Sequence, residues 1–213
     1  MKPRLRPHRG RPVLRLLTAA VLAFSAPALL TPSALQAQAL PNLGGTDGEE
    51  LSPYTQENLG VKYPLFSVND LIAKSEAAMM SWKKISAEDR AGILVECLEE
   101  IKKHFFAIAH ATMHTTGQSY MMSFQASGPH ANDRAMEVVS MAYHELQRFP
   151  SEVDWVKNMG KFDLHLKKNY KPIPKGVALV IGCSTFPTWN TVPGLFGSLM
   201  TGNASIVKPH PKS

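Results

Sequence analysis

Residues 174–209 read PKGVALVIGCSTFPTWNTVPGLFGSLMTGNASIVKP, and this stretch decides the fold class. The continuous apolar run at 176–182 predicts a strand buried in a parallel sheet, and the shorter run at 204–208 predicts a second strand. A helix fits between Pro193 and Thr201. Parallel strands need a crossover of a dozen or more residues, usually a helix, so this order predicts a right-handed βαβ unit.

Three amphipathic helices are predicted before this unit. The first opens at residues 67–70, the second at Ser86, which stands three residues before Asp89 as in a capping box, and the third stops at Pro150. Their apolar stripes are Leu71, Ala78 and Trp82; Leu94, Leu98, Ile101, Phe105 and Ile108; and Ala135, Val139, Ala142, Leu146 and Phe149. The second stripe runs without interruption and predicts one long helix.

The helical front and the βαβ unit together predict an α/β fold whose parallel sheet has only begun where the sequence ends. A single βαβ unit cannot cover both faces of a parallel sheet, so we expect a truncated domain. Between the two parts, residues 163–167 alternate polar and apolar side chains. This alternation predicts an exposed strand with an unpaired edge.

Charge is concentrated at the N-terminus. Six of the 23 basic residues lie within the first fifteen positions, and the remaining 17 equal the 17 acidic residues in number. The chain beyond this stretch is formally neutral, so the net charge of +6 does not indicate a nucleic-acid partner.

Residues 1–39 have the parts of an export signal: the basic stretch, an uncharged apolar run at 16–30, and the triplet AQA at 37–39. The alternative is a membrane anchor, but a run that contains Pro27 is short of the ~20 residues that a bilayer requires. We predict a cleaved leader, export to the periplasm or medium, and no stable membrane association afterwards. Residues 40–64, rich in Gly, Pro, Asn and Ser, predict a linker.

The cysteines and histidines predict neither a disulfide framework nor a metal site. Cys97 and Cys183 are far apart in sequence and lie in different contexts. His110 and His114 have the spacing of a zinc pair on a helix, but position 111 is Ala where a zinc protease would carry its glutamate.

Three blocks carry a resemblance to a known family: IAHATMHTTGQSYMMSFQASGPHANDR at 108–134, ALVIGCSTFPTWN at 178–190 and TGNASIVKPHP at 201–211. Their order and spacing resemble the aldehyde dehydrogenase superfamily, and the blocks are similar to the PaaN-type members of phenylacetate degradation. The resemblance covers residues 50–211 and identifies residues 65–213 as part of an NAD(P)-binding, Rossmann-like domain.

The resemblance implies a cofactor site at the carboxyl ends of the two strands. Cys183, Ser184 and Thr185 follow the first strand, and Lys208 and His210 end the second. Ligands of such sheets bind at this edge, where a lysine suits the ribose and phosphate region of the cofactor.

Two positions depart from the family pattern. Thr185 takes the place of the asparagine that hydrogen bonds the developing oxyanion, and Asn190 comes five residues too late. A hydroxyl also donates one hydrogen bond, so Thr185 is the candidate at this place. Pro211 replaces the glutamate that binds the ribose hydroxyls in NAD-preferring members, so either NAD or NADP is expected.

The family reaction needs a cysteine nucleophile and a carboxylate base that lie downstream of the matched blocks, and neither Cys97 nor Cys183 occupies the nucleophile's place. The resemblance implies oxidation of a small aldehyde, free or CoA-linked, by a cytoplasmic homo-oligomer; we expect this chain alone to be inactive. The leader conflicts with that location. Two alternatives stay open: an exported, non-catalytic binding or structural protein, or a chimeric reading frame whose residues 39–44 resemble the start of exported metalloproteases.

Overall fold

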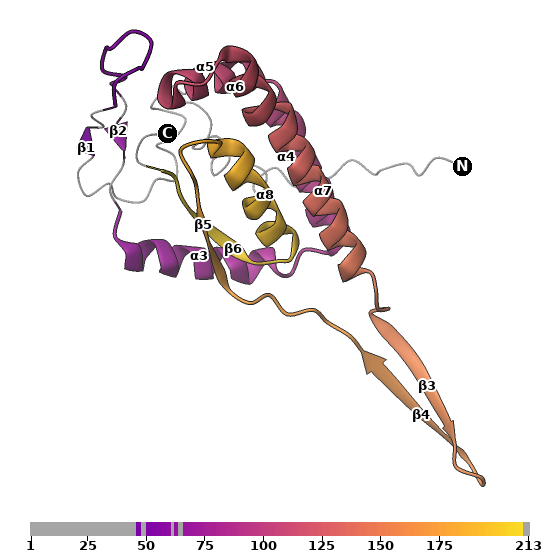
Figure 1. Cartoon of the computed structure of the whole chain (residues 1–213). Coiled ribbons are helices and arrows are strands. Elements are labelled where there is room, and N and C mark those ends of the chain that lie inside the picture. Colours follow the sequence, from indigo (N-terminus) through magenta and orange to yellow (C-terminus); the bar gives the residue numbers. More distant parts are fainter. Residues whose placement is uncertain (1–45, 48–49, 61, 64–65, 211–213) are drawn as a thin grey trace.

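The computed structural model describes residues 46–47, 50–60, 62–63 and 66–210. In chain order its elements are β1 (Thr46–Asp47), β2 (Lys62–Tyr63), α3 (Val68–Trp82), α4 (Ala87–Lys102), α5 (Phe105–Thr116), α6 (Tyr120–Ser127), α7 (Pro129–Leu146), β3 (Glu152–Asn158), β4 (Asp163–Asn169), β5 (Val177–Ile181), α8 (Pro187–Met200) and β6 (Ala204–Lys208) (Figure 1). The predicted leader lies outside the described residues. Within the predicted linker, β1 and β2 form a short antiparallel pair.

The predicted βαβ unit is present. Strands β5 and β6 pair in parallel, with Val177 opposite Ala204 and Ile181 opposite Lys208, and α8 connects them. The helix is longer than predicted, because it begins at Pro187 and carries Pro193 inside it. Proline suits the first helical position, where its missing N–H has no partner to lose, whereas a proline inside a helix costs a hydrogen bond that packing must offset.

Only one face of this two-stranded sheet is well covered. Helix α8 packs so closely that a Cβ at Gly194 would lie 3.4 Å from a methyl group of Val180. Helix α3 contacts both strands, yet Leu179 and Ile181 remain 62% and 61% exposed. The prediction of a parallel strand is therefore confirmed, and the prediction that it is buried is wrong within the described part of the chain.

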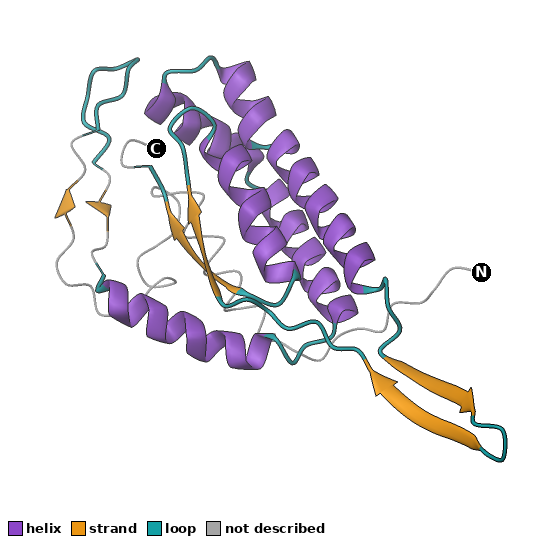
Figure 2. Ribbon diagram, turned by 60° about the horizontal axis from the view of Figure 1, so that its bottom comes forward, coloured by secondary structure: helices purple, strands orange, loops and turns teal. Residues whose placement is uncertain are grey.

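Helices α4, α7 and α8 lie side by side on one side of the strands, and α3 runs along the other (Figure 2). Their shared core includes Leu94, Ala135 and Phe196, all completely buried. At Gly197 a Cβ would lie 2.7 Å from Val138, so α7 and α8 need a glycine at their contact. The helical front and the βαβ unit thus form one packed body.

The predicted long helix is wrong, because the chain bends at Lys103–His104 between α4 and α5. Its apolar residues keep their spacing through the bend, since both helices face the same core, and spacing does not report a change of axis. Helix α6 was not predicted. Phe149 was assigned to the third helix, but α7 ends at Leu146 and the Phe149 ring packs instead on Tyr170.

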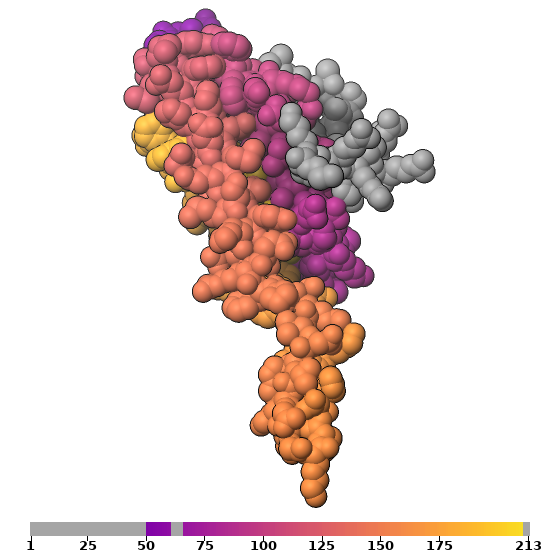
Figure 3. All heavy atoms as spheres, turned by 90° about the vertical axis from the view of Figure 1, so that its right-hand side faces the viewer, coloured from indigo at the N-terminus to yellow at the C-terminus, as the bar shows by residue number. Residues whose placement is uncertain are grey.

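Strands β3 and β4 form an antiparallel hairpin that extends from the body as a narrow arm (Figures 1 and 3). The predicted exposed strand is β4, every residue of which is exposed. The prediction that it is unpaired is wrong, because β4 pairs with β3 along its whole length. Each strand still has one outer edge without a partner strand in the described chain.

Two long-range contacts hold the C-terminal end of α8. The indole N–H of Trp82 donates to the carbonyl of Leu199 at 2.8 Å, and Arg90 Nε donates to the carbonyl of Met200 at 3.0 Å. Arg90 Nη1 also donates to the carbonyl of Ile85 at 2.6 Å. Desolvation lowers the pKa of the buried Arg90. Carbonyls at a helix end carry partial negative charge, which favours a cation there.

We predict that Arg90→Met lowers the free energy of unfolding by on the order of 3 kcal/mol, because methionine keeps the apolar stem but leaves two enclosed carbonyls without donors. Urea unfolding followed by circular dichroism measures the change. The control is Arg134→Met, at an exposed arginine paired with Glu137, where a change below about 1 kcal/mol is expected. Equal effects of the two substitutions would contradict the importance of the Arg90 contacts.

Cys97 belongs to the same core and is 3% exposed. Burial first, and then the neighbouring Glu96 and Glu100 carboxylates, raise the pKa of its thiol to about 11. At neutral pH the side chain is therefore a protonated, enclosed thiol.

The Cys97 thiol should make stability fall as the pH rises from 9 to 11. In that interval the unfolded chain releases the proton near the ordinary pKa of 9.0, whereas the folded chain retains it. The free energy of unfolding should fall by on the order of 2 kcal/mol across this interval. Below pH 9 both states keep the proton, so this thiol should cause no change in stability there. Unfolding titrations across this range should show a shallower decline in stability for Cys97→Ala than for the unmodified chain; parallel curves for the two proteins would disprove the assignment.

Candidate functional site

The structure brings the carboxyl-terminal ends of β5 and β6, here called the strand exits, together at one edge of their sheet. Ile181 and Lys208 are opposite each other, and the Gly182 N–H donates to the Lys208 carbonyl at 2.9 Å. The predicted residues 183–185 leave this edge from β5, and His210 leaves it from β6. All five predicted cofactor-site residues therefore lie in the two segments that begin at this edge.

A side chain at position 182 would be crowded where the ends of β5 and β6 meet. A Cβ at this position would lie 3.0 Å from the Thr191 hydroxyl, 3.4 Å from Pro209 Cα and 3.6 Å from the His210 nitrogen. The Thr191 hydroxyl is itself fixed, because it donates to the Pro187 carbonyl at 2.6 Å. Backbone from both strands and the first turn of α8 thus approach one another closely only because residue 182 has no side chain.

The residues after Gly182 form a tight turn into α8. Within it the Phe186 N–H donates to Cys183 Sγ at 3.5 Å. The Cys183 thiol in turn donates to the Phe186 carbonyl oxygen at 3.7 Å. The Phe186 ring packs edge-to-face on Trp189, with 5.8 Å between centroids. Ser184 is half-buried and Thr185 is exposed, so both present polar groups near the sheet edge.

Neither thiol of the described chain has the environment of a catalytic thiolate. Cys97 is buried and protonated, and Cys183 contributes its sulfur to the hydrogen bonds of its own turn. Cys97 and Cys183 are not joined to each other by a disulfide. A nucleophilic cysteine needs an accessible thiolate, which burial opposes at Cys97.

The structure also brings a residue to this turn that sequence reasoning missed. Gln118, between α5 and α6, donates from its side-chain amide to the carbonyl of Thr185. The only local signal was the preceding Gly117, which ends α5 in the left-handed conformation with φ of 76°. Asn190, the asparagine nearest to the predicted oxyanion position, is exposed in the first turns of α8.

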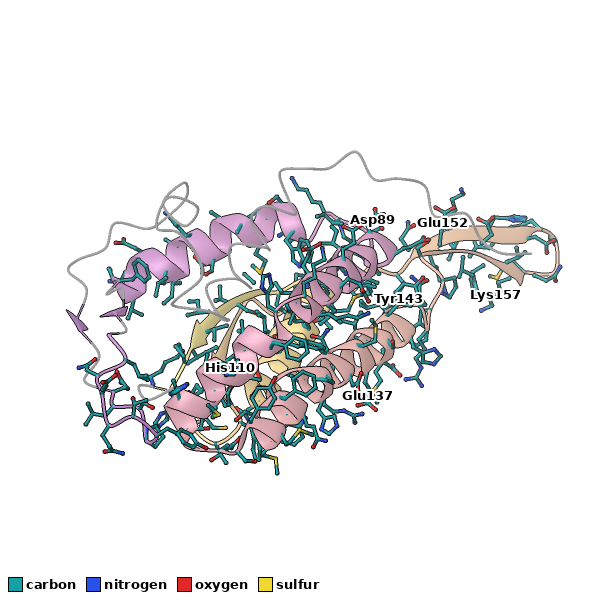
Figure 4. All side chains as sticks on the ribbon, turned by 90° about the horizontal axis from the view of Figure 1, so that it is seen from above. Asp89, His110, Glu137, Tyr143, Glu152 and Lys157 are labelled. Atoms are coloured by element: carbon teal, nitrogen blue, oxygen red, sulfur yellow. The ribbon has the colours of Figure 1, made fainter. Side chains whose placement is uncertain are left out.

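The two histidines of α5 face different partners. His114 Nδ1 is 2.8 Å from the hydroxyl of the buried Ser52, and the His110 ring packs on Tyr120 at 5.0 Å between centroids. Figure 4 shows His110 on α5. Among the residues that the structure describes, no cluster of three or more His, Cys, Asp or Glu side chains could hold a metal ion.

None of the helices in the described ranges combines the length and apolar character that crossing a bilayer requires.

Comparison with known proteins places this geometry in a family. The model of the aldehyde dehydrogenase family matches residues 45–213. The crystal structure of an NAD-dependent aldehyde dehydrogenase from Burkholderia multivorans is 40% identical, with a TM-score of 0.79 over 94% of this chain and 35% of that chain. No functionally curated protein matches the sequence significantly.

Two more distant structures share the fold. The NADP-dependent glyceraldehyde-3-phosphate dehydrogenase from Bacillus halodurans, complexed with NADP, is 19% identical, with a TM-score of 0.62 over 81% of this chain and 35% of that chain. A mutant of aldehyde dehydrogenase C from Pseudomonas syringae, complexed with NAD+ and octanal, is 20% identical, with a TM-score of 0.62 over 80% and 33%. The chain spans about a third of the length of these solved relatives. By the family match and the 40% identical structure, this chain belongs to the aldehyde dehydrogenase family.

Proposed function

We propose that this chain supplies the front part of the cofactor-binding domain of an NAD(P)-dependent aldehyde dehydrogenase that acts in phenylacetate or related aromatic catabolism. The observation that carries the proposal is the sheet edge at which Lys208 closes β6 beside the glycine turn that follows β5. The aromatic substrate class rests on the quoted sequence blocks, which resemble the PaaN-type members.

The residues at this edge fit a dinucleotide. Gly182 keeps the two strand exits free of a Cβ, and Lys208 is an exposed cation at a strand end, suited to a cofactor phosphate or ribose oxygen. Ser184 and Thr185 add hydroxyl groups that donate and accept hydrogen bonds. A dinucleotide held at this edge would supply the hydride acceptor for aldehyde oxidation.

Both forms of the cofactor are compatible with this edge. Residues 171–213 contain no Asp or Glu, so the βαβ unit carries no carboxylate to bind the ribose hydroxyls or to repel a 2′-phosphate. Solved relatives include one described as NAD-dependent and one complexed with NADP. We therefore propose NAD or NADP as the cofactor, and a small aldehyde as the substrate.

The attacking thiolate and the carboxylate base of the proposed reaction come from outside these 213 residues. Covalent aldehyde oxidation requires a thiolate that reaches the aldehyde carbon, and Cys97 is enclosed in the core. We propose that this chain binds and orients the cofactor, and that turnover requires the portion of the relatives' length that it does not span.

We predict that Lys208→Ala weakens binding of NAD+ and NADP+ by roughly ten- to a hundredfold, because it removes a charge-assisted contact. Calorimetric titration of the chain with each cofactor measures the loss. The control is Lys175→Ala, since Lys175 is also exposed but precedes β5 at the opposite end of the strands. Equal, small losses in both variants, or no binding by the unmodified chain, would refute the proposed cofactor edge.

We further propose that the β3–β4 hairpin joins copies of the protein into a homo-oligomer. One face of the hairpin carries the apolar side chains of Val153, Trp155, Leu164 and Leu166, since opposite residues in the register share a face. Lys168 Nζ lies 4.2 Å from the centre of the Trp155 ring on that face. In Figure 4 the labelled Glu152 and Lys157 lie on opposite sides of the arm, and the register places Lys157 at the far end of the face that carries Trp155.

Leu166→Lys should weaken self-association by at least about tenfold, because it places a charge at the centre of the apolar face. Sedimentation equilibrium measures the association. Val156→Lys is the matched control: Val156 is 50% exposed, but it lies on the polar face opposite His165. An unchanged association constant for Leu166→Lys, or an equal loss for Val156→Lys, would exclude the apolar face as the interface.

A further inference from the structure

The helical front and the cofactor edge are joined by one side chain. Gln118 lies in the three-residue connection between α5 and α6, and its Nε2 donates to the backbone carbonyl of Thr185, 67 residues later. Thr185 is in the middle of the turn from β5 to α8. In the described part of the chain, this is the hydrogen bond that reaches Thr185 from another segment.

The two ends of the turn are fixed by other contacts. At its start the Gly182 N–H donates to the Lys208 carbonyl, and at its end the Phe186 carbonyl accepts from Asn190 as the first bond of α8. The Thr185 side chain is exposed. The hydrogen bond from Gln118 therefore holds the middle of the turn, which the contacts at the two ends of the turn constrain least.

Gln118 is itself held from two sides. The Tyr54 hydroxyl donates to the Gln118 carbonyl at 2.6 Å and lies 3.3 Å from the Gly117 carbonyl. Within the connection, the Gln118 N–H donates to the Thr116 hydroxyl at 3.3 Å. A side chain whose own backbone is fixed on both flanks can hold the position of the group that it binds.

The oxygen of the same carboxamide argues against a purely stabilising role for Gln118. Gln118 Oε1 is enclosed and has no hydrogen-bond partner among the described residues. Enclosing an acceptor without a donor opposes folding, so an apolar side chain would serve stability better at this position. Such local conflicts in natural proteins concentrate at functional sites.

We propose that Gln118 is a positioning residue, which fixes the backbone of residues 183–186 and so sets the geometry of the edge where the cofactor binds. The functional part of this inference rests on the proposed cofactor site, whereas the structural part does not. Because Gln118 acts through the Thr185 carbonyl, its loss should loosen the turn without unfolding the core.

Three substitutions separate the donor from the size of the side chain. Gln118→Met keeps the length and removes the donor, Gln118→Glu turns an acceptor toward the Thr185 carbonyl, and Gln118→Lys restores a donor of similar reach. The matched control is Gln125→Met, at an exposed glutamine of α6. Hydrogen exchange of residues 182–190 and alkylation of Cys183, resolved from Cys97 by peptide mapping, report the turn. Titration with NAD+ and NADP+ measures the cofactor affinity of the proposed site at the sheet edge.

Gln118→Met and Gln118→Glu should raise exchange and Cys183 alkylation by about tenfold, with a comparable loss of cofactor affinity. Gln118→Lys should restore both, and Gln125→Met should change neither. Unchanged exchange in Gln118→Met, or an equal rise in α4, would overturn the inference. If the unmodified chain binds neither cofactor, the proposed function fails, and exchange and alkylation still decide the role of Gln118.

Discussion

The contact on which the rest of the structure depends is the capture of the last carbonyls of α8 by Trp82 and Arg90. Helix α8 is the crossover that connects the paired strands β5 and β6 and packs on their sheet. Its C-terminal carbonyls need donors, and the two donors come from the end of α3 and the start of α4. One set of hydrogen bonds thus satisfies the helix end and ties the helical front to the βαβ unit.

Local sequence rules predicted the parts of this body that depend on local physics. Ser67 and Ser86 begin helices, and each side chain accepts from the N–H three residues on. The order of strand, helix and strand at 177–208 is also as predicted. The same rules failed where tertiary contacts decide: the bend after Lys103 keeps the apolar spacing, and Pro193 lies inside a helix that packing sustains.

The site divides in the same way. Residues 183–185, Lys208 and His210 could be selected from sequence, because parallel strands bring their carboxyl ends to one edge. Gln118 could not be selected, because its partner is a backbone carbonyl 67 residues away. Every residue has such a carbonyl, so the sequence does not identify which one accepts the hydrogen bond. The pairing of β4 with β3 was missed for a related reason, since seven residues such as EVDWVKN show alternation too weakly to predict a strand.

The capture of α8 also fixes when the chain can complete its core during synthesis. Arg90 and Met200 are separated by 110 residues, and Trp82 and Leu199 by 117. Closing loops of this length is slow, and it cannot begin until residue 200 has left the ribosome. Until then α4 and α7 expose the faces that later enclose Phe196, which is completely buried in the finished molecule. From the completion of α7 at Leu146 until Met200 has emerged, the nascent chain therefore exposes the apolar faces of α4 and α7.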